Sequence, residues 1–550
     1  MSTKIIIVTG GVVSSLGKGI ITASLGALLK SYGFTNIKIM KVDPYLNIDP
    51  GTMSPHQHGE VFVLKDGSET DLDLGYYERF TETELTTDNN YTSGQIFSQV
   101  FEKERNGDYL GETVQVIPHL TNHIKSLILK DKEKYDFILV EIGGTIGDLE
   151  SMWFLESVRQ LRQEYPDDTA LVHLSLIPYL EKAKELKTKP TQHTVKELMS
   201  LGLTPPDVLV CRTQVKGSLT EALKRKIAQF CNLRYEAVIE SPDLDSIYQM
   251  PSQLHSENIA KVLFKKLNVK PLLEQPELSD WLQLEESIRK TSESPRRVKI
   301  IIVGKYVPYD DAYKSLVEAI RIAGYHLETQ TEIIWVNSRN TTFVELSSIL
   351  VGEGDALNTG LIVPGGFGED GTEFKLMAIK IARELRIPFL GICFGMQLAA
   401  IEFAQNVMGL PKMTSEEFHP TTDPSNHLIK ILDPNVKKMG GTMRLGNKKI
   451  LISDQSIAHE TYGCMDQTEI VQERHRHRFD LDIDLVKKHK FHEKGFRVTG
   501  SDENGIPEII EIEDHPYFIA VQYHPEYTST LMNGHPLFKR LIQKAIKYNC

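Results

Sequence analysis

Short apolar runs alternate with longer amphipathic stretches through the first half of the chain. Ala23, Ala27 and Leu28 keep helical spacing after the first run, and helices are predicted around Glu150–Glu164 and Thr191–Leu201. This alternation predicts a parallel sheet covered by helices, with ligands bound at the carboxyl ends of the strands. The runs predicted as buried strands are 4–8, Ile37–Val42, Phe137–Ile142, Ala170–Ile177 and Val208–Cys211.

The pattern is interrupted between Leu267 and Arg297. Trp281, Leu284 and Ile288 have helical spacing there, prolines flank them, and residues 291–295 form a polar linker. We therefore place a domain boundary in this segment.

Alternation of strands and helices resumes after the boundary. Apolar runs at Lys299–Gly304, Gly360–Val363, Pro388–Ile392 and Phe518–Val521 predict further strands. The sequence thus predicts an α/β protein of two domains, each with a mostly parallel sheet flanked by helices. The predicted domains are 1–268 and 298–550, joined by a linker at 269–297.

Composition narrows the class of protein. A chain of 550 residues is too long for one ordinary core, and 41% hydrophobic with 25% charged residues is typical of a soluble globular protein. The net charge of −12 argues against a nucleic-acid or anionic-membrane partner. No apolar run is long enough to span a bilayer, and the N-terminus predicts a strand instead of a signal peptide. Five scattered cysteines (211, 231, 393, 464 and 550) favour a reducing cytoplasm over a disulfide framework.

The segment Val8–Ile20 has the order strand, glycine-rich turn, helix that a phosphate-binding loop requires. Glycines let backbone N–H groups approach phosphate oxygens, and Lys18 would reach a terminal phosphate. The match is imperfect, because Val12 stands where the first glycine is usual and Gly19 replaces the hydroxyl residue. An ordinary glycine turn is the alternative interpretation.

Polar residues follow several of the predicted strands. Lys41 and Asp43 end one strand, Glu141 ends another, and Asp71–Leu74 would place alternating carboxylates on one face of an extended segment. A hard cation that bridges nucleotide phosphates needs one or two such oxygen ligands, and Asp73 and Glu141 are the candidates. The alternative is that each is a solvated loop acid.

Two further polar segments have alternative interpretations. Lys187–Gln192 begins a helix with proline and hydroxyls at its cap, so its lysines would form an anion site or simply a solvated helix start. His56 and His58 are interpreted as a loop pair, since no third metal ligand is in view.

Cys393 lies between Gly391 and Gly395 at a strand-to-helix turn. This is the cysteine version of a nucleophile elbow, in which a tight turn exposes the side chain and the helix N-terminus favours a thiolate. A buried structural cysteine is the alternative.

A base for this nucleophile is predicted far along the chain. His524 and Glu526 flank a proline, which allows Glu526 to orient His524 while His524 serves the cysteine. The basic run Arg474–Arg478 disfavours a metal and favours a carboxylate ligand, with a solvated basic strand as the alternative.

Over essentially its whole length the chain resembles the CTP synthase family. The resemblance implies a C-terminal class I glutamine amidotransferase, in which Cys393 attacks the glutamine amide and His524 and Glu526 complete the triad. The stretches that carry it are Gly10–Gly19, Lys41–Tyr45, Asp49–Pro55, Gly59–Val63, Thr70–Gly75, Glu141–Asp148, Lys187–Gln192, Gly391–Gln397, Gly440–Gly446, Glu473–Arg478 and His524–Glu526. The glutamine-binding residues that it implies are Gly366, Phe394, Gly395, Met396, Gln397, Glu417 and Arg478.

The resemblance implies a P-loop NTPase-like amidoligase in the N-terminal half. ATP would phosphorylate O4 of UTP, and ammonia would displace that phosphate to give CTP, a step of de novo pyrimidine biosynthesis. The implied Mg²⁺ ligands are Asp73 and Glu141. The implied ATP site comprises Ser15, Leu16, Gly17, Lys18, Gly19, Ile20, Lys41, Asp73, Pro242, Asp243 and Leu244. The implied UTP and CTP site comprises Ser14, Asp148, Leu149, Glu150, Lys187, Thr188, Lys189, Pro190, Thr191, Gln192 and Lys226.

Regulation and assembly are also implied by the family. CTP would inhibit through Asp148–Glu150, GTP would activate, and the enzyme would be a homotetramer, filamentous in some members. One difference from the family concerns activation by GTP, because Asp370 occupies the position where the family usually has an arginine linked to that activation. Two other functions are alternatives. The first is an amidoligase with another acceptor, and the segments Lys187–Gln192 and Asp148–Glu150 argue against it. The second is a nucleotide-binding assembly protein with an inactive glutaminase domain, and the intact triad argues against it.

Overall fold

The computed structural model describes residues 2–307, 310–351, 358–421, 423–433, 442–463 and 468–547. These residues form two compact units. Unit 1 comprises the chain up to Asp49 together with Asp73–Glu285, and unit 2 comprises Pro50–Leu72 together with the described residues from Glu286 on. Cys464, Cys550 and residues 440 and 441 of one family-like stretch lie outside the described residues.

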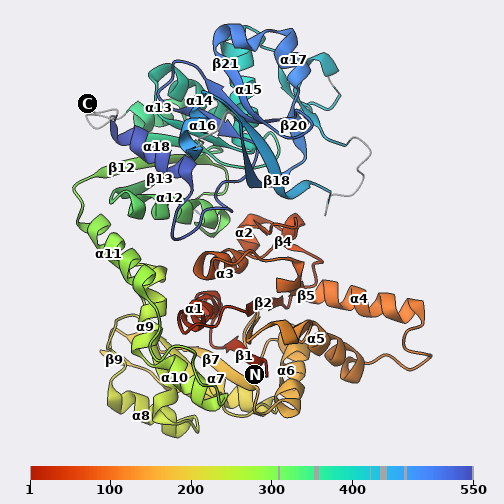
Figure 1. The fold of residues 1–550 in the computed structure, drawn as a ribbon, viewed down its shortest axis with the longest axis vertical. Coiled ribbons are helices and arrows are strands. Elements are labelled where there is room, and N and C mark those ends of the chain that lie inside the picture. Colours follow the sequence, from red (N-terminus) through yellow and green to blue (C-terminus); the bar gives the residue numbers. More distant parts are fainter. Residues whose placement is uncertain are drawn as a thin grey trace. The chain divides into compact units, whose positions relative to one another are not determined.

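Unit 1 is built on a parallel sheet (Figure 1). Within residues 2–285 its strand order is β11-β10-β7-β1-β6-β2-β5, and every neighbouring pair is parallel. The strands are β1 (Lys4–Gly10), β2 (Ile37–Asp43), β5 (Asn90–Thr92), β6 (Phe137–Ile142), β7 (Thr169–Leu176), β10 (Val208–Thr213) and β11 (Val238–Pro242). A separate hairpin pairs β8 (Tyr179–Leu180) with β9 (Glu185–Leu186).

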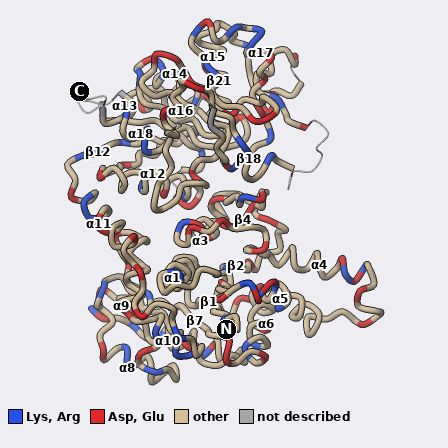
Figure 2. Tube along the Cα trace, viewed as in Figure 1, with Lys and Arg blue, Asp and Glu red and all other residues tan. Residues whose placement is uncertain are grey.

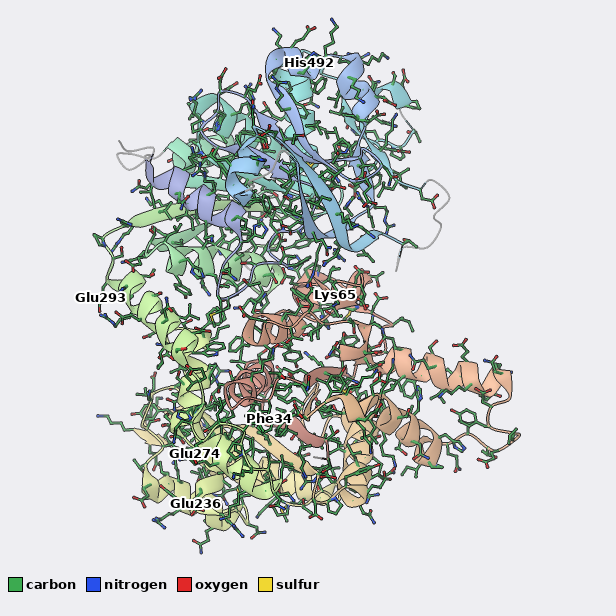
Figure 3. All side chains as sticks on the ribbon, viewed as in Figure 1. Phe34, Lys65, Glu236, Glu274, Glu293 and His492 are labelled. Carbon is green, nitrogen blue, oxygen red and sulfur yellow. The ribbon has the colours of Figure 1, made fainter. Side chains whose placement is uncertain are left out.

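Helices cover this sheet, and every residue of its central strands β1 and β6 is buried, as expected for a parallel sheet with both faces covered. Ile7, Val140 and Leu171 pack in one core cluster with Val158 of α6 and Leu198 of α7. Phe34, labelled in Figure 3, is buried against the ring of Phe137 at 4.9 Å between centroids. The helices are α1 (Lys18–Ser31), α3 (Asp73–Thr81), α4 (Ser93–Asn106), α5 (Thr121–Ile128), α6 (Met152–Glu164), α7 (Lys189–Ser200), α8 (Glu221–Phe230), α9 (Met250–Ser256) and α10 (Ile259–Lys266). A further helix, α11 (Ser279–Glu293), begins in unit 1 and ends in the residues assigned to unit 2.

Unit 2 contains a larger sheet that is parallel in one half and antiparallel in the other. Among the described residues its order is β13-β12-β14-β15-β23-β22-β21-β18-β19, and the pairing is parallel from β13 to β23 and antiparallel from β23 to β19. The strands are β12 (Arg297–Gly304), β13 (Gln330–Asn337), β14 (Thr359–Val363), β15 (Phe389–Ile392), β18 (Arg444–Ser453), β19 (Thr468–His477), β21 (Phe496–Ser501), β22 (Pro507–Ile512) and β23 (Phe518–Val521).

Smaller elements complete unit 2. A three-stranded sheet joins β16 (Thr414–Ser415), β17 (His427–Ile431) and β20 (Phe479–Leu481). The segment 50–72 contributes α2 (Pro55–His58) and the hairpin of β3 (Phe62–Val63) with β4 (Glu69–Thr70). The remaining helices are α12 (Lys314–His326), α13 (Phe343–Val351), α14 (Thr372–Leu385), α15 (Phe394–Asn406), α16 (Ile457–Tyr462), α17 (Ile483–Lys488) and α18 (Pro536–Lys547).

The predicted strands and helices of the first half are confirmed, with ends that shift by one or two residues. The prediction of an extended Asp71–Leu74 is wrong, because Asp73 begins α3. Residues 291–293 of the expected linker are the end of α11. Basic and acidic residues are interspersed along both units (Figure 2). Every helix in the described part of the chain is too short or too polar to cross a membrane.

Candidate active sites

The turn between β1 and α1 contains the predicted phosphate-binding loop. Val12, Ser15 and Gly17 have positive φ angles of 83°, 54° and 95°, so the chain folds back on itself before the helix. Lys18 is the first residue of α1, and a Cβ on Gly10 would lie 3.0 Å from its side chain. The predicted strand, turn and helix therefore lie where the sequence places them.

Charged groups from four elements converge behind this turn. Lys18 donates from Nζ to the Gly144 carbonyl at 2.7 Å. Lys41, near the end of β2, forms an ion pair with Asp73 at the start of α3. Tyr77 of α3 donates its hydroxyl hydrogen to Glu141 near the end of β6. The structure thus brings together the two lysines and the two carboxylates that the sequence predicts for the ATP and Mg²⁺ sites.

The electrostatics of this cluster fit a divalent cation. Burial and the neighbouring Asp73 carboxylate raise the pKa of Glu141 to about 8, and burial lowers the pKa of Lys18. Two carboxylates that repel each other in a buried place are an oxygen donor set for a hard cation such as Mg²⁺. No group of three His, Cys, Asp or Glu side chains in the described chain could hold a metal, so phosphate oxygens or water would complete the coordination.

Gly19 explains the missing hydroxyl of the phosphate loop. A Cβ at this position would lie 2.1 Å from Oδ1 of Asp73. The carboxylate occupies the space that a serine or threonine side chain would need. A carboxylate oxygen from α3 therefore lies where the usual motif has a side-chain hydroxyl.

A cavity of about 270 Å³ lies beside the phosphate loop. It joins two segments far apart in sequence that are both predicted to contact ATP. Its wall comprises Leu16, Gly17, Ile20, Ile21, Arg212, Ser241, Pro242, Asp243, Leu244, Ile247 and Met250.

Arg212 of this wall was missed by the sequence analysis. Its guanidinium donates to Oδ1 of Asp243 and to the Ser15 carbonyl, each at 3.0 Å. It ties the loop to the segment that follows β11. Its place near the carboxyl end of a predicted strand is the signal that could have found it.

The segment 187–192 begins α7 and is only partly exposed. Thr191 is buried and donates to the Leu176 carbonyl at 3.2 Å, and Gln192 donates to Oγ1 of Thr188 at 3.2 Å. Lys189 and Pro190 form the first turn of α7, Lys187 pairs with Glu185, and Lys226 lies exposed on α8.

The other residues predicted to bind UTP or CTP lie at the surface of unit 1. Ser14 and Asp148 are exposed, and Leu149 is 76% exposed. Within residues 2–285, no hydrogen bond or ion pair joins Asp148, Leu149 or Glu150 to Lys187–Gln192.

His173 is a buried residue in unit 1 that the sequence analysis missed. Its ring nitrogens face Oγ1 of Thr9 at 2.9 Å and Oγ1 of Thr194 at 3.1 Å. Burial lowers its pKa to about 3, so the ring is neutral and links β1 to α7. A Cβ on Gly11 would lie 1.7 Å from the same Thr194 hydroxyl, which explains the glycine there.

In unit 2, Cys393 occupies a strained turn between β15 and α15. Its φ and ψ are 51° and −102°, an uncommon conformation for a residue with a side chain. A Cβ on Gly391 would lie 2.7 Å from Ala520, and a Cβ on Gly395 would lie 2.1 Å from the Val363 carbonyl. Both glycines are therefore required by close packing, as expected for a nucleophile elbow.

His524 lies next to this cysteine and is oriented by a carboxylate. Oε1 of Glu526 is 2.7 Å from Nδ1 of His524, and the Tyr527 ring stacks on the imidazole at 4.9 Å. Burial lowers the pKa of His524, but Glu526 and Cys393 outweigh burial and raise it to about 10. Nε2 is buried without a hydrogen-bond partner among the described residues, so it is available to exchange a proton with the thiol.

A loop rich in glycine lies opposite the cysteine. A Cβ on Gly365 would lie 2.7 Å from Cε1 of His524, whereas Gly366 has only ordinary contacts around it. The Gly368 N–H donates to Glu417 at 2.8 Å, and the charge of Arg478 acts on the same carboxylate. Gly366, Glu417 and Arg478 thus lie around one loop, as predicted for glutamine binding.

The other residues predicted to bind glutamine are buried. The Met396 side chain is fully buried, and Gln397 donates to the Phe479 carbonyl at 2.9 Å and to Oε1 of Gln522 at 3.3 Å. Both side chains are directed into the protein, so only their backbone is left for a ligand. Phe394 and Gly395 supply the first turn of α15 beside them.

Lys375 is a further buried residue near this loop that the sequence analysis missed. Its Nζ lies 5.0 Å from the centre of the Phe394 ring. Burial and the charge of Lys305 lower its pKa to about 7.

The basic strand predicted at Arg474–Arg478 is not solvated. Arg474 is buried and donates to the Val63 carbonyl at 3.0 Å, and Arg476 pairs with Glu69 at 2.9 Å. His475 and His477 lie on the opposite face of β19 and are also buried. The strand is covered by the 50–72 segment of its own unit, which the sequence assigned to the first domain.

His56 and His58 have neighbours of their own within unit 2. His56 packs edge-on against the Tyr306 ring at 5.2 Å, and Nε2 of His58 lies 3.7 Å from Asp71. The carboxylate of Asp71 is thereby engaged in unit 2, whereas Asp73 belongs to unit 1.

Both halves of the chain are similar to known proteins. A family model of the CTP synthase N-terminus matches residues 4–269, and one of class-I glutamine amidotransferases matches residues 309–544. A CTP synthase of Granulibacter bethesdensis is 47% identical over 556 residues, covering 99% of both chains. One of Halalkalibacterium halodurans is 46% identical over 553 residues, covering 100% of both. A solved glutaminase domain of Trypanosoma brucei CTPS with bound acivicin is 30% identical and covers 46% of this chain and 94% of its own, with a TM-score of 0.38. The chain belongs to the CTP synthase family.

Proposed function

We propose that the chain catalyses the ATP-dependent amination of UTP to CTP with ammonia from glutamine. The observation that carries this proposal is the presence of two separate sets of reactive groups in one chain, one in each unit. Unit 2 holds Cys393 beside His524 and Glu526, and unit 1 holds Lys18 among the charged groups behind a phosphate loop. Membership of the family supports the same activity.

In the proposed glutaminase step, Cys393 attacks the side-chain amide of glutamine. His524 takes the thiol proton through Nε2 and returns it to the leaving ammonia, while Glu526 keeps the ring oriented. Backbone N–H groups at the start of α15 and at Gly366 would bind the oxyanion. Glu417 and Arg478 offer one charge of each sign for the amino and carboxylate groups of glutamine.

In the proposed amination step, Lys18 and Lys41 bind the phosphates of ATP. Asp73 and Glu141 would hold Mg²⁺, which supplies positive charge against the phosphate oxygens. Lys41 must leave its ion pair with Asp73 when ATP binds, so the resting cluster keeps the lysine charge neutralised until the substrate arrives. O4 of UTP is a poor leaving group until it is phosphorylated, and ammonia then displaces the phosphate.

We also propose that UTP and CTP bind at a site completed by a second subunit of a cytoplasmic homotetramer. One observation supports a shared site: Phe101, Leu110 and Ile117 are exposed on and between α4 and α5. Exposed apolar side chains on neighbouring elements are typical of interaction sites. Analytical ultracentrifugation with and without UTP and ATP would test tetramer formation and would also reveal filaments.

Activation by GTP is proposed through the loop that carries Asp370. This aspartate forms an ion pair with Arg339, and both charges act on the buried amine of Lys305. Arg339 therefore supplies a positive charge beside the position where the family has its arginine. A GTP titration of the glutamine-dependent reaction tests this, and Arg339→Ala should weaken the activation; absence of any GTP effect in the unsubstituted chain would refute it.

The main proposal is tested by mixing the purified chain with UTP, ATP, Mg²⁺ and glutamine. Formation of CTP, followed by absorbance, is the expected result. Absence of CTP with every component present would refute the proposal. If another acceptor is aminated while UTP is not, the chain is an amidoligase of different specificity; if nucleotides bind without turnover, it is an assembly protein.

A further inference from the structure

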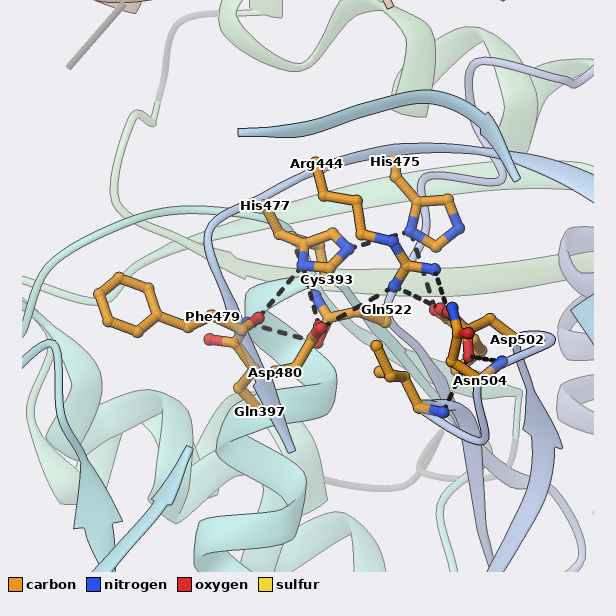
Figure 4. Close-up of polar contacts among 12 residues, drawn as sticks. Cys393, Gln397, Arg444, His475, His477, Phe479, Asp480, Asp502, Asn504 and Gln522 are labelled. Atoms are coloured by element: carbon orange, nitrogen blue, oxygen red, sulfur yellow. Dashed lines mark hydrogen bonds and ion pairs between the residues drawn. The ribbon is translucent and has the colours of Figure 1, made fainter. Parts of the chain in front are cut away.

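Two buried glutamines lie directly behind the nucleophile (Figure 4). Gln522, which follows β23 and precedes His524 by two residues, is fully buried. Its Nε2 lies 3.6 Å from Sγ of Cys393, and its Oε1 accepts a hydrogen bond from Gln397 at 3.3 Å. Gln397 in turn donates to the backbone carbonyl of Phe479 at 2.9 Å. The three contacts form one chain that ends at the sulfur.

The direction of this chain is fixed from its far end. A backbone carbonyl can only accept hydrogen bonds, so Phe479 requires the NH₂ group of Gln397 to face it. The second hydrogen of the same NH₂ group then requires the oxygen of Gln522 to face Gln397. Since one end of the Gln522 amide is thereby an acceptor, its NH₂ group must point at Cys393.

Cys393 therefore has one acceptor and one donor beside its sulfur. As a thiol it donates to the Arg476 carbonyl on β19 at 3.6 Å. As a thiolate it has no proton to give and needs donors, and Gln522 supplies one. A buried thiolate without such a donor would be costly, because charge is poorly solvated inside the protein.

We propose that Gln522 is a further catalytic residue that donates a hydrogen bond to the Cys393 thiolate, and that Gln397 is a positioning residue that holds the Gln522 amide. The inference rests on the proposed glutaminase function of Cys393. In the step concerned, the S–H bond of Cys393 breaks, its proton moves to Nε2 of His524, and the electron pair remains on sulfur facing the Gln522 N–H. Gln397 acts through Gln522 and does not touch the substrate.

The experiment measures the thiolate directly, without glutamine. The full chain is alkylated with iodoacetamide over a range of pH, and mass spectrometry follows the peptide that contains Cys393. Gln522→Met removes the donor at similar size, and Gln522→Glu replaces the donor with a negative charge. We expect the midpoint of the rate profile to rise by about one pH unit for Gln522→Met, which is about tenfold less thiolate below the midpoint, and further for Gln522→Glu.

Other charges act on the same titration and stay in place in these variants. The charge of a Cys393 thiolate acts on His524 and on the neutral phenol of Tyr527, and His475 and His477 flank the Arg476 carbonyl on β19. The midpoint therefore belongs to the Cys393–His524 pair. A purely structural role of Gln522 would lower the amount of folded protein or the rate at every pH, but it would not move the midpoint.

Gln405→Met is the matched control. Gln405 lies on the same helix, α15, and donates to the Met413 carbonyl at 2.8 Å, which is the kind of contact that Gln397 makes. Its variant should keep the midpoint of the unsubstituted chain, and Gln397→Met should raise the midpoint by less than Gln522→Met. If the unsubstituted chain has a low midpoint and neither Gln522 variant changes it, the inference about Gln522 is wrong, while the proposed glutaminase function still stands. If Cys393 of the unsubstituted chain reacts like an ordinary thiol, with a midpoint of about 8.5, the result counts against the proposed glutaminase function itself.

Discussion

The two candidate sites use the same local design but hold their reactive groups differently. Each lies where a parallel strand turns sharply into a helix, β1 into α1 and β15 into α15. In unit 1 the charged side chains come from several elements and neutralise one another, as Lys41 does with Asp73. In unit 2 the reactive side chain is fixed by its own backbone, at the strained Cys393.

This difference predicts how the reactive groups of each site behave before the substrate binds. Ion pairs between flexible side chains can be exchanged, so a triphosphate can compete for Lys18 and Lys41. A backbone that leaves no room for a Cβ at Gly391 and Gly395 cannot rearrange, so the nucleophile stays aligned. We expect substitutions in unit 2 to act by misplacing atoms and those in unit 1 to act by changing charge.

The largest expected effect separates the two sites completely. Cys393→Ala removes the nucleophile, so glutamine-dependent formation of CTP should fall by at least about 10⁴-fold. Added ammonia should still support CTP formation, because the substitution leaves unit 1 unchanged. A coupled assay with either nitrogen source measures both rates. If ammonia also fails, the division of labour between the units is wrong.

Lys18→Ala should abolish both routes, by about 10²–10³-fold, because both consume ATP at unit 1. Glutamine hydrolysis alone, measured as glutamate released, should persist. Lys30→Ala is the control, since Lys30 lies near the other end of α1 and donates to the Thr83 hydroxyl at 2.7 Å. Normal ammonia-dependent activity in Lys18→Ala would mean that ATP binds elsewhere.

The parts of each site that follow one another in sequence were predictable. The turn at Gly10–Lys18 and the elbow at Cys393 are local, because glycine spacing and flanking apolar runs determine a strand–turn–helix unit. The pairing of His524 with Glu526 follows from their two-residue separation. The parallel sheet of unit 1 follows from its alternating pattern.

The parts that depend on long-range packing were not predictable from the residues alone. Asp71 and Asp73 are neighbours in sequence, yet each belongs to a different unit, because a helix begins at Asp73. The family resemblance implies that Gln397 binds glutamine, whereas packing directs its side chain toward Gln522. In the antiparallel half of the unit 2 sheet, β18 pairs with β21, which is not the next strand along the chain, and no local pattern reports this pairing.

A pair of glycine substitutions sharpens the contrast between backbone and side-chain design. In Gly395→Ala the new Cβ would lie 2.1 Å from the Val363 carbonyl, and backbone cannot move aside. We expect about 10²-fold loss of glutamine hydrolysis with ammonia-dependent activity kept. In Gly19→Ala the Cβ meets the end of the Asp73 side chain, which can rotate, so we expect only about tenfold loss of ATP-dependent activity. Equal losses in the two variants would contradict the comparison.

The smallest expected effect concerns the pH dependence of stability in unit 1. Burial and Asp73 raise the pKa of Glu141 from 4.5 to about 8. Between these values the unfolded chain has released the proton that the folded chain still holds, so this group makes stability fall as pH rises, by at most about 1.4 kcal/mol per pH unit. Glu141→Gln removes the titration. Its melting temperature relative to the unsubstituted chain, measured without Mg²⁺, should therefore increase from pH 5 to pH 8, while Glu133→Gln, at an exposed position, should show no such trend. Since Mg²⁺ with ATP would bind the ionised carboxylate, adding both should reduce the gain in melting temperature of Glu141→Gln at pH 8. A gain in melting temperature that is the same at every pH would show that Glu141 does not titrate in this range.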